Sequence, residues 1–123
     1  MKAVLVVDDS PTIRRMVKAA LAGIASRLVE AGSGLQAIEQ LTLTPIDLIV
    51  LDLNMPDMHG LEVLKFVRRH PSLGRLPVII LTTRGDDVSR DLAMEAGATA
   101  YLTKPFSPAA LAEEVRAQSH VQS

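Results

Sequence analysis

The chain has 123 residues, of which 48% are hydrophobic and 22% charged, as expected for one globular domain with its own core rather than a disordered segment. Its 13 basic and 14 acidic residues give a formal net charge of −1, so the basic face of a nucleic-acid-binding domain is not expected. The absence of cysteine excludes disulfides, thiol catalysis and cysteine-bound zinc, and the absence of an apolar run of about 18 residues excludes a membrane span.

Five short runs rich in aliphatic residues are spaced along the chain and predict strands. Several of these runs are nearly continuous Val, Ile and Leu, which is typical of strands buried on both faces of a parallel sheet. The predicted strands are Ala3–Val7, a weaker Arg27–Glu30, Leu48–Leu51, Val78–Leu81 and Ala98–Leu102.

Between these runs, apolar residues recur every three or four positions, which is the spacing of one face of a helix. Ser10 and Pro11 predict the N-cap and first position of the first helix, and Ser107 opens the fifth. Asp86 and Asp87 would lie at the positive N-terminal end of the fourth. The apolar positions in chain order are Ile13, Met16, Val17, Ala20, Leu21, Ile24; Leu35, Ile38, Leu41; Leu61, Leu64, Val67; Val88, Leu92, Ala96; Leu111 and Val115.

The alternation of strands and helices predicts a single α/β domain over residues 1–123, with residues 119–123 as a frayed tail. Short connections imply right-handed crossovers and a parallel sheet covered by helices on both faces. Because ligands bind outside the carboxyl ends of the strands in such sheets, the residues that close each strand are the candidates for chemistry.

Polar side chains close four of the five predicted strands. They are Asp8 and Asp9 after the first, Asp52 after the third, Thr82 after the fourth and Lys104 shortly after the fifth. Three carboxylates at one edge would raise one another's pKa unless a cation were bound, and hard oxygen ligands suit Mg²⁺. Asp52 could then act as a nucleophile toward a phosphoryl group. Each residue alone also has a plain structural role, such as a helix cap, a turn or a solvated side chain.

These residues lie in four stretches that resemble the receiver domain of bacterial response regulators. The spacing also agrees, with 43 residues from Asp9 to Asp52, 30 more to Thr82 and 22 more to Lys104. The stretches are VLVVDDSPTIRRMV (4–17), DLIVLDLNMPDMHGLEVL (47–64), VIILTT (78–83) and AYLTKPF (100–106).

The resemblance implies a flavodoxin-like (βα)5 fold with strand order 2-1-3-4-5 and a role for each matching residue. Mg²⁺ is the implied cofactor, with Mn²⁺ as a substitute. The implied roles are phosphoacceptor for Asp52, direct metal ligand for Asp9, water-mediated metal contact for Asp8, main-chain carbonyl ligand for Asn54, phosphate contact for Lys104, a coupled switch pair for Thr82 and Tyr101, and a cis bond for Lys104–Pro105.

The resemblance also implies the partners. A sensor histidine kinase or a histidine phosphotransfer protein would donate the phosphoryl group, and the surface of the fourth helix, fifth strand and fifth helix would control a downstream protein. Such a domain is a signalling switch that catalyses only its own phosphorylation and dephosphorylation. Asn54 and Arg84, each two residues after a site residue, could border the path of the hydrolytic water and so tune the lifetime of the phosphorylated state.

Further expectations concern assembly and location. The stretch Ala98-Thr99-Ala100-Tyr101 lacks the acidic pair common before the switch Tyr of DNA-binding regulators, which favours a monomer or a weak phosphorylation-dependent dimer. We expect a stand-alone receiver, because the chain stops after the fifth predicted helix. We expect it in the cytoplasm, because the first strand begins almost at Met1 and leaves no room for a signal peptide.

Two alternatives from other functional classes remain. A degenerate receiver would bind proteins without ever accepting phosphate. A phosphatase with an aspartate nucleophile would use a similar sheet. Such enzymes carry the motif Asp-x-Asp after the first strand, whereas Asp8 and Asp9 are adjacent here.

Overall fold

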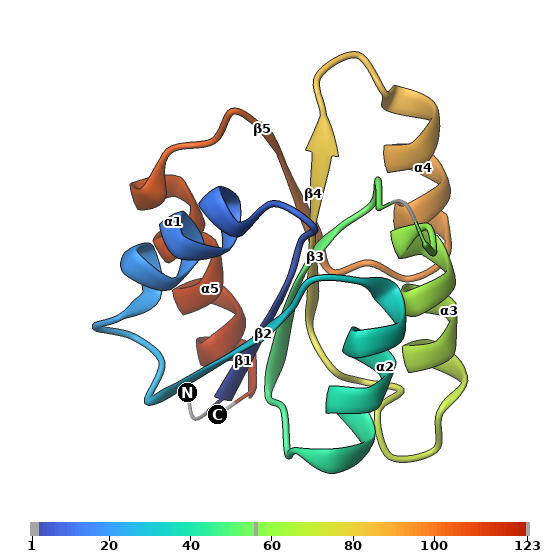
Figure 1. The fold of residues 1–123 in the computed structure, drawn as a ribbon, viewed down its shortest axis with the longest axis horizontal. Coiled ribbons are helices and arrows are strands. Elements are labelled where there is room, and N and C mark those ends of the chain that lie inside the picture. The colour runs from blue at the N-terminus through green and yellow to red at the C-terminus, as the bar shows by residue number, and fades with distance from the viewer. Residues whose placement is uncertain (1–2, 56, 123) are drawn as a thin grey trace.

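The computed structural model describes residues 3–55 and 57–122, which form five strands alternating with five helices (Figure 1). The elements are β1 (Ala3–Val7), α1 (Pro11–Leu21), β2 (Arg27–Ala31), α2 (Gly34–Leu43), β3 (Leu48–Asp52), α3 (Gly60–Arg69), β4 (Val78–Thr83), α4 (Asp87–Glu95), β5 (Ala100–Lys104) and α5 (Pro108–Gln122). The predicted α/β fold is thus confirmed. Helix α5 continues to Gln122, and the final residue of the predicted frayed tail lies outside the described residues.

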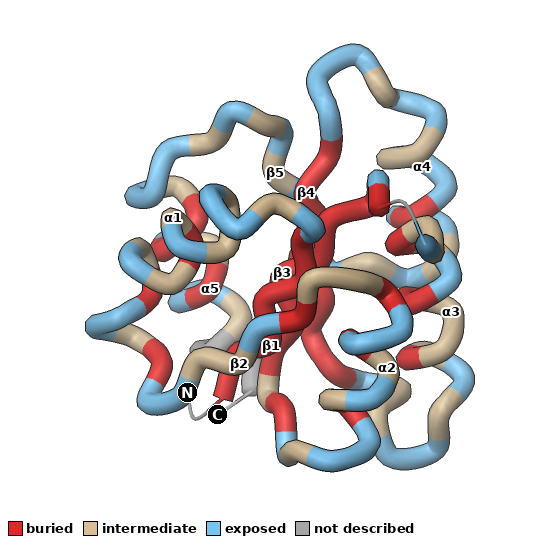
Figure 2. The backbone as a smooth tube through the Cα atoms, in the orientation of Figure 1, coloured by how far each residue is buried: buried red, intermediate tan, exposed pale blue. Residues whose placement is uncertain are grey.

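The strands form one parallel sheet in the order β2-β1-β3-β4-β5, as the resemblance implies. Helices α1 and α5 cover one face, and α2, α3 and α4 cover the other (Figure 1). The central strands β1 and β3 are buried along their whole length, whereas the edge strands β2 and β5 are only partly buried (Figure 2). Coverage on both faces explains why the central strands are continuous aliphatic runs rather than alternating ones.

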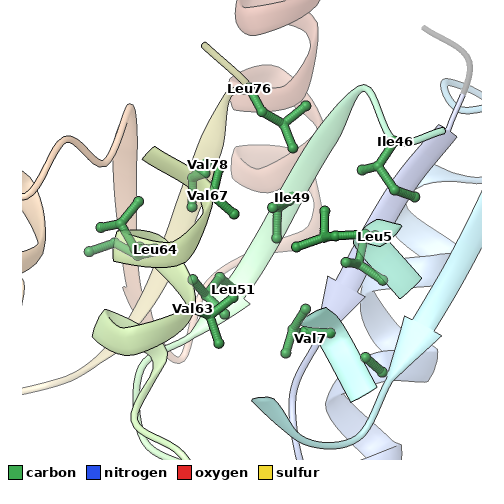
Figure 3. Packing of buried hydrophobic residues seen from close by; sticks show 14 of the residues in the cluster. Leu5, Val7, Ile46, Ile49, Leu51, Val63, Leu64, Val67, Leu76 and Val78 are labelled. Carbon is green, nitrogen blue, oxygen red and sulfur yellow. The ribbon is translucent and has the colours of Figure 1, made fainter. Parts of the chain in front are cut away.

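The core is divided by the sheet into two hydrophobic clusters. Successive side chains of a strand point to opposite faces, so Leu5 and Val7 join the cluster beneath α2, α3 and α4, whereas Val4 and Val6 join the one beneath α1 and α5. Figure 3 shows part of the first cluster, in which Leu51 of β3 lies beside Val63 of α3, with Leu5 and Val7 of β1 further along the same face of the sheet. The two clusters hold the sheet between helical layers, so the carboxyl ends of the strands occupy a defined edge.

Three helix starts are capped by Ser10, the predicted N-cap, and by Asp86 and Ser107, the residues predicted to lie at the starts of the fourth and fifth helices. Ser10 Oγ accepts a hydrogen bond from the Ile13 amide at 3.3 Å, and Asp86 Oδ1 accepts one from the Ser89 amide at 3.2 Å. At the start of α5, Ser107 Oγ accepts from the Ala110 amide at 3.0 Å. These bonds satisfy amides that have no partner inside the helix and fix where the chain turns after β1, β4 and β5.

The predicted boundaries of three strands are wrong in a way that matters for the site. β3 and β4 extend to Asp52 and Thr83, and β5 begins at Ala100 and ends at Lys104. Thr99, predicted as strand, instead donates its amide to the Val78 carbonyl at 2.8 Å just before the ladder begins. The candidate residues of β3, β4 and β5 are therefore fixed by strand pairing rather than lying beyond it.

The predicted core-facing positions of two helices are also partly wrong. Leu35 of α2 is 63% exposed, and Val88 and Leu92 of α4 are 72% and 47% exposed. The buried positions on these helices include Ala37 and Ala93. Small side chains let a helix approach the sheet closely, so the face of each helix that contacts the sheet includes an alanine. The prediction from periodicity instead assigned the larger apolar side chains to this face.

Among the described residues, no helix combines the length and apolarity needed to cross a bilayer.

Candidate functional site

Three carboxylates meet at the carboxyl edge of the sheet, as predicted. Asp8 and Asp9 follow β1, and Asp52 ends the neighbouring strand β3. One oxygen from each of the three lies within 4.8 Å of the others. Asp8 and Asp52 are buried and Asp9 is exposed, so the cluster has a closed inner side and an open outer side.

Asp8 is held through both its side chain and its main chain. Its Oδ1 accepts the Ser10 amide at 2.9 Å, which links the carboxylate to the start of α1. Its main-chain carbonyl accepts a hydrogen bond from Arg14 Nη1 at 2.7 Å, and the same guanidinium forms an ion pair with Glu30 at 3.0 Å. Sequence reasoning missed Arg14, because a single arginine on an amphipathic helix gives no signal of a contact with the loop before it.

Lys104 reaches the two buried carboxylates from β5. Its Nζ lies 3.0 Å from Asp8 Oδ2 and 3.2 Å from Asp52 Oδ1. Burial lowers the pKa of Lys104, but the hydrogen bond to Asp8 and the charge of Asp52 outweigh that effect, so its pKa is raised above the usual value. The ammonium group therefore stays charged at neutral pH and offsets part of the negative charge of the site.

The balance of charge at Asp52 remains unfavourable. Its burial, followed by the charge of Asp8, raises the pKa of Asp52 above the usual value, although Lys104 and the Asn54 amide act in the opposite direction. Asn54 donates this hydrogen bond at 3.3 Å to Asp52 Oδ1. The site therefore holds more negative charge than its own cation compensates, and a further cation would stabilise it.

Asn54 also joins the loop after β3 to β4. Its side-chain Nδ2 donates to Thr83 Oγ1 at 3.1 Å, and residue Asn54 is exposed. Sequence reasoning included Asn54 but missed Thr83, since the neighbouring Thr82 matched the family position. Arg84, the other candidate for tuning the lifetime of a phosphorylated state, is exposed just beyond β4.

Thr82 and Tyr101 lie on adjacent strands but do not both face the carboxylates. Thr82 is buried, and its hydroxyl lies 3.4 Å from both the Leu102 carbonyl and Thr103 Oγ1 on β5. Tyr101 is 42% exposed, and the guanidinium of Arg90 lies 5.2 Å from the centre of its ring. In this conformation the Thr82 hydroxyl is directed toward β5 and the Tyr101 ring toward α4.

The donor set of the cluster fits a hard divalent cation. It offers carboxylate oxygens from Asp8, Asp9 and Asp52, with the main chain of Asn54 held beside them by its bond to Asp52. Mg²⁺ prefers oxygen ligands and retains several waters, and the exposed side of Asp9 leaves room for them. The Lys104–Pro105 peptide bond, which follows the lysine of the site, is cis.

A five-stranded parallel sheet in this order, with acidic residues and a lysine at its carboxyl edge, defines a flavodoxin-like domain of the receiver type. The family model of the response regulator receiver domain matches residues 4–116. The chain belongs to this family of signalling domains.

Relatives among known proteins agree with this assignment. The chain is 38% identical over 113 residues to a chemotaxis protein CheY homolog of Campylobacter jejuni, covering 90% of this chain and 87% of the relative. It is 37% identical to chemotaxis protein CheY1 of Helicobacter pylori, covering 90% and 91%. The structure of the chemotaxis response regulator CheY4 of Vibrio cholerae superposes with a TM-score of 0.88 at 34% identity, covering 96% and 98% of the two chains.

Proposed function

We propose that the chain accepts a phosphoryl group on Asp52 in a Mg²⁺-dependent reaction and thereby switches the surface formed by α4, β5 and α5. The donor would be a sensor histidine kinase or a histidine phosphotransfer protein, and the switched surface would control a downstream protein partner. The observation that carries the proposal is the clustering of Asp52 with Asp8 and Asp9 within 4.8 Å, with Lys104 at 3.2 Å.

The chemistry assigns a different task to each residue. An Asp52 carboxylate oxygen attacks phosphorus and forms the acyl phosphate, while the bond from phosphorus to the donor nitrogen breaks and the donor keeps that electron pair. The ammonium of Lys104 offsets charge on the transferred group, and Asp8, Asp9 and the Asn54 carbonyl would hold the cation with Asp52. When bound, Mg²⁺ supplies the positive charge that lets a carboxylate accept a phosphoryl group, and Mn²⁺ could replace it.

The switch would operate through Thr82 and Tyr101. A phosphoryl group on Asp52 offers new acceptor oxygens, and its formation would draw the buried Thr82 hydroxyl away from its 3.4 Å contacts on β5. The vacated space would let the half-exposed Tyr101 turn inward and change the surface of α4 and β5. Hydrolysis would reset the switch, with Asn54 and Arg84 bordering the path of the attacking water.

The proposal extends to the location, partners and oligomeric state of the domain. We propose a cytoplasmic domain that recognises proteins rather than nucleic acid or membrane and that is a monomer or a weak phosphorylation-dependent dimer. Two observations favour a phosphorylatable domain over a degenerate one. The three carboxylates all lie within 4.8 Å, and the lysine contacts two of them directly.

Intact mass spectrometry tests the proposal. Wild type and Asp52→Asn are incubated with acetyl phosphate, with Mg²⁺ or with EDTA. One phosphoryl adduct in wild type, absent in EDTA and absent in the variant, is the expected result. No adduct from either acetyl phosphate or a panel of kinases would support the degenerate receiver, and steady turnover of a small phosphate ester would support the phosphatase.

A further inference from the structure

We propose that Asp57 is a positioning residue for the Asp52 site, because its carboxylate fastens the loop between β3 and α3 to the N-terminus of α2. The inference rests on the proposed function, since this loop carries Asn54, the residue assigned to the cation through its main chain. Asp57 itself does not contact the carboxylate cluster in the described structure; it would act through the loop.

The contact is made by both carboxylate oxygens. Asp57 Oδ1 accepts the Gly34 amide at 3.1 Å, and Oδ2 accepts the Leu35 amide at 3.2 Å, across a separation of 23 and 22 residues. These are the first amides of α2, which have no acceptor inside the helix, and a negative charge is favourable at this end of the helix. The third amide, that of Gln36, is bound by Ser33 Oγ at 3.1 Å. The helix thus takes one cap from its own chain segment and two from the β3–α3 loop.

The state of the Asp57 carboxyl agrees with this contact. Although desolvation acts to raise its pKa, hydrogen bonds from the amides of Leu35 and Gly34 outweigh that effect, and the pKa of the exposed Asp57 carboxyl is lowered. The carboxyl is therefore ionised at neutral pH and accepts both bonds as a charged group.

Packing beside the hydrogen bonds brings the same two segments together. A Cβ atom placed on Gly34 would lie 2.7 Å from the Met58 Cβ, a distance too short for two carbon atoms. Gly34 is buried, and Met58 packs against the cluster beneath α2, α3 and α4. The start of α2 therefore lies directly against the Met58 side chain, and the exposed Asp57 makes its two hydrogen bonds at the edge of this packed contact.

The loop is held from three sides, and Asp57 supplies the side facing α2. Next to β3, the Gly60 amide donates to the Leu53 carbonyl at 2.7 Å. Toward β4, the Asn54 side chain donates to Thr83 at 3.1 Å. Without Asp57 only the packing of Met58 would hold the loop to α2, and the main chain at Asn54, three residues earlier, would lose part of its orientation toward Asp52.

The test compares Asp57→Ala with Ser33→Ala, which removes a cap from the same helix N-terminus without touching the loop. Two quantities are measured: the Mg²⁺ dissociation constant by calorimetry, and hydrogen exchange of the Asn54 and Gly60 amides in metal-free protein by NMR. For Asp57→Ala we expect a dissociation constant raised about tenfold, the range seen when groups that orient metal ligands are removed, together with faster exchange at both amides. For Ser33→Ala we expect both quantities to stay near wild type.

Asp57→Asn provides a graded variant, because its amide has one acceptor oxygen for the two N–H groups and should give intermediate values. The proposal is overturned if Asp57→Ala binds Mg²⁺ within twofold of wild type, or if Ser33→Ala weakens binding equally. A wild-type protein that binds no Mg²⁺ would instead overturn the proposed function. The exchange comparison would then support or overturn the ordering of the loop by Asp57 without any metal measurement.

Discussion

At the scale of single residues, the site is defined by two buried carboxylates that share one lysine. Lys104 lies 3.0 Å from Asp8 and 3.2 Å from Asp52, and yet the pKa of Asp52 is raised because burial and Asp8 act against its ionised form. The excess negative charge that destabilises the metal-free protein is compensated when a cation binds. The ionised Asp52 therefore lowers the stability of the metal-free protein and favours binding of a cation.

Replacing Asp52 with Asn is expected to stabilise the metal-free protein at pH 7. A folded-state pKa above the usual 3.8 means that ionising Asp52 opposes folding once the pH rises past that value. The advantage of Asp52→Asn should be largest at neutral pH and shrink as the pH falls toward 3.8. Urea unfolding in EDTA at pH 7 and about pH 4.5 measures it. A variant less stable than wild type at pH 7 would contradict this account of the site.

Replacing Arg90 with Ala should make the inward orientation of Tyr101 more populated. The guanidinium lies 5.2 Å from the ring centre, which is a weak cation–π contact at an exposed site. Its loss corresponds to a rise of roughly two- to fivefold in the inward population. Because the chain has one Tyr and no Trp, fluorescence quenching by acrylamide reports on this ring alone. Arg75→Ala, which removes an exposed charge elsewhere, serves as the control and should leave quenching unchanged.

At the scale of elements, the position of Asp52 depends on how closely α3 approaches the end of β3. The buried Gly60 begins α3, and its amide bonds to the Leu53 carbonyl at 2.7 Å. A Cβ atom there would collide with the Asp52 carbonyl oxygen and lie 2.7 Å from the Leu53 Cα. Both neighbours are backbone atoms, one of Asp52 at the end of the central strand β3 and one of Leu53 directly after it, so neither can move aside cheaply.

Gly60→Ala is therefore expected to destabilise the protein by about 1–3 kcal/mol, as overpacking of a core does, and to slow phosphorylation of Asp52. Gly23→Ala is the matched control, because a Cβ atom at Gly23 has no neighbour within 4 Å. That control should be neutral or slightly stabilising, since alanine restricts the unfolded chain. Equal stability of the two variants in thermal unfolding would show that α3 can shift away from β3.

At the scale of the whole molecule, the site joins parts of the chain that are far apart in sequence. Lys104 and Asp8 are separated by 96 residues, and they meet because β5 and β1 belong to one parallel sheet. A ligand that binds at this edge therefore contacts several distant segments at once and should stabilise the whole folded domain.

Mg²⁺ is accordingly expected to raise the melting temperature of the wild-type protein. A ligand at 100 times its dissociation constant adds about 2.7 kcal/mol to the free energy of unfolding. Asp9→Asn, which removes the exposed carboxylate of the cluster, should abolish most of this shift while leaving the core intact. Calorimetric scans with Mg²⁺ and with EDTA measure it, and a Mg²⁺-dependent shift of full size in Asp9→Asn would argue against the assigned cation site.

The sequence by itself determined the alternation of elements, the helix starts and the set of polar residues at the strand ends. These features can all be read along the chain: the aliphatic runs, the N-cap Ser10, the acidic residues Asp86 and Asp87 at the start of the fourth helix, and the family spacing from Asp9 to Lys104. The predicted ends of β3, β4 and β5 lie one or two residues early, because Asp52 and Thr82 are polar although pairing keeps them in the ladder.

Only the tertiary structure decided which side chains contact segments distant in the chain. The ion pair of Arg14 with Glu30, the bond from Asn54 to Thr83 and the link from Asp57 to α2 each join elements with no fixed spacing in sequence. The same holds for the outward faces of α2 and α4, where close packing through alanines set the orientation of the helix. Local pattern determines what each element is, whereas packing and charge balance among distant segments determine what the site can do.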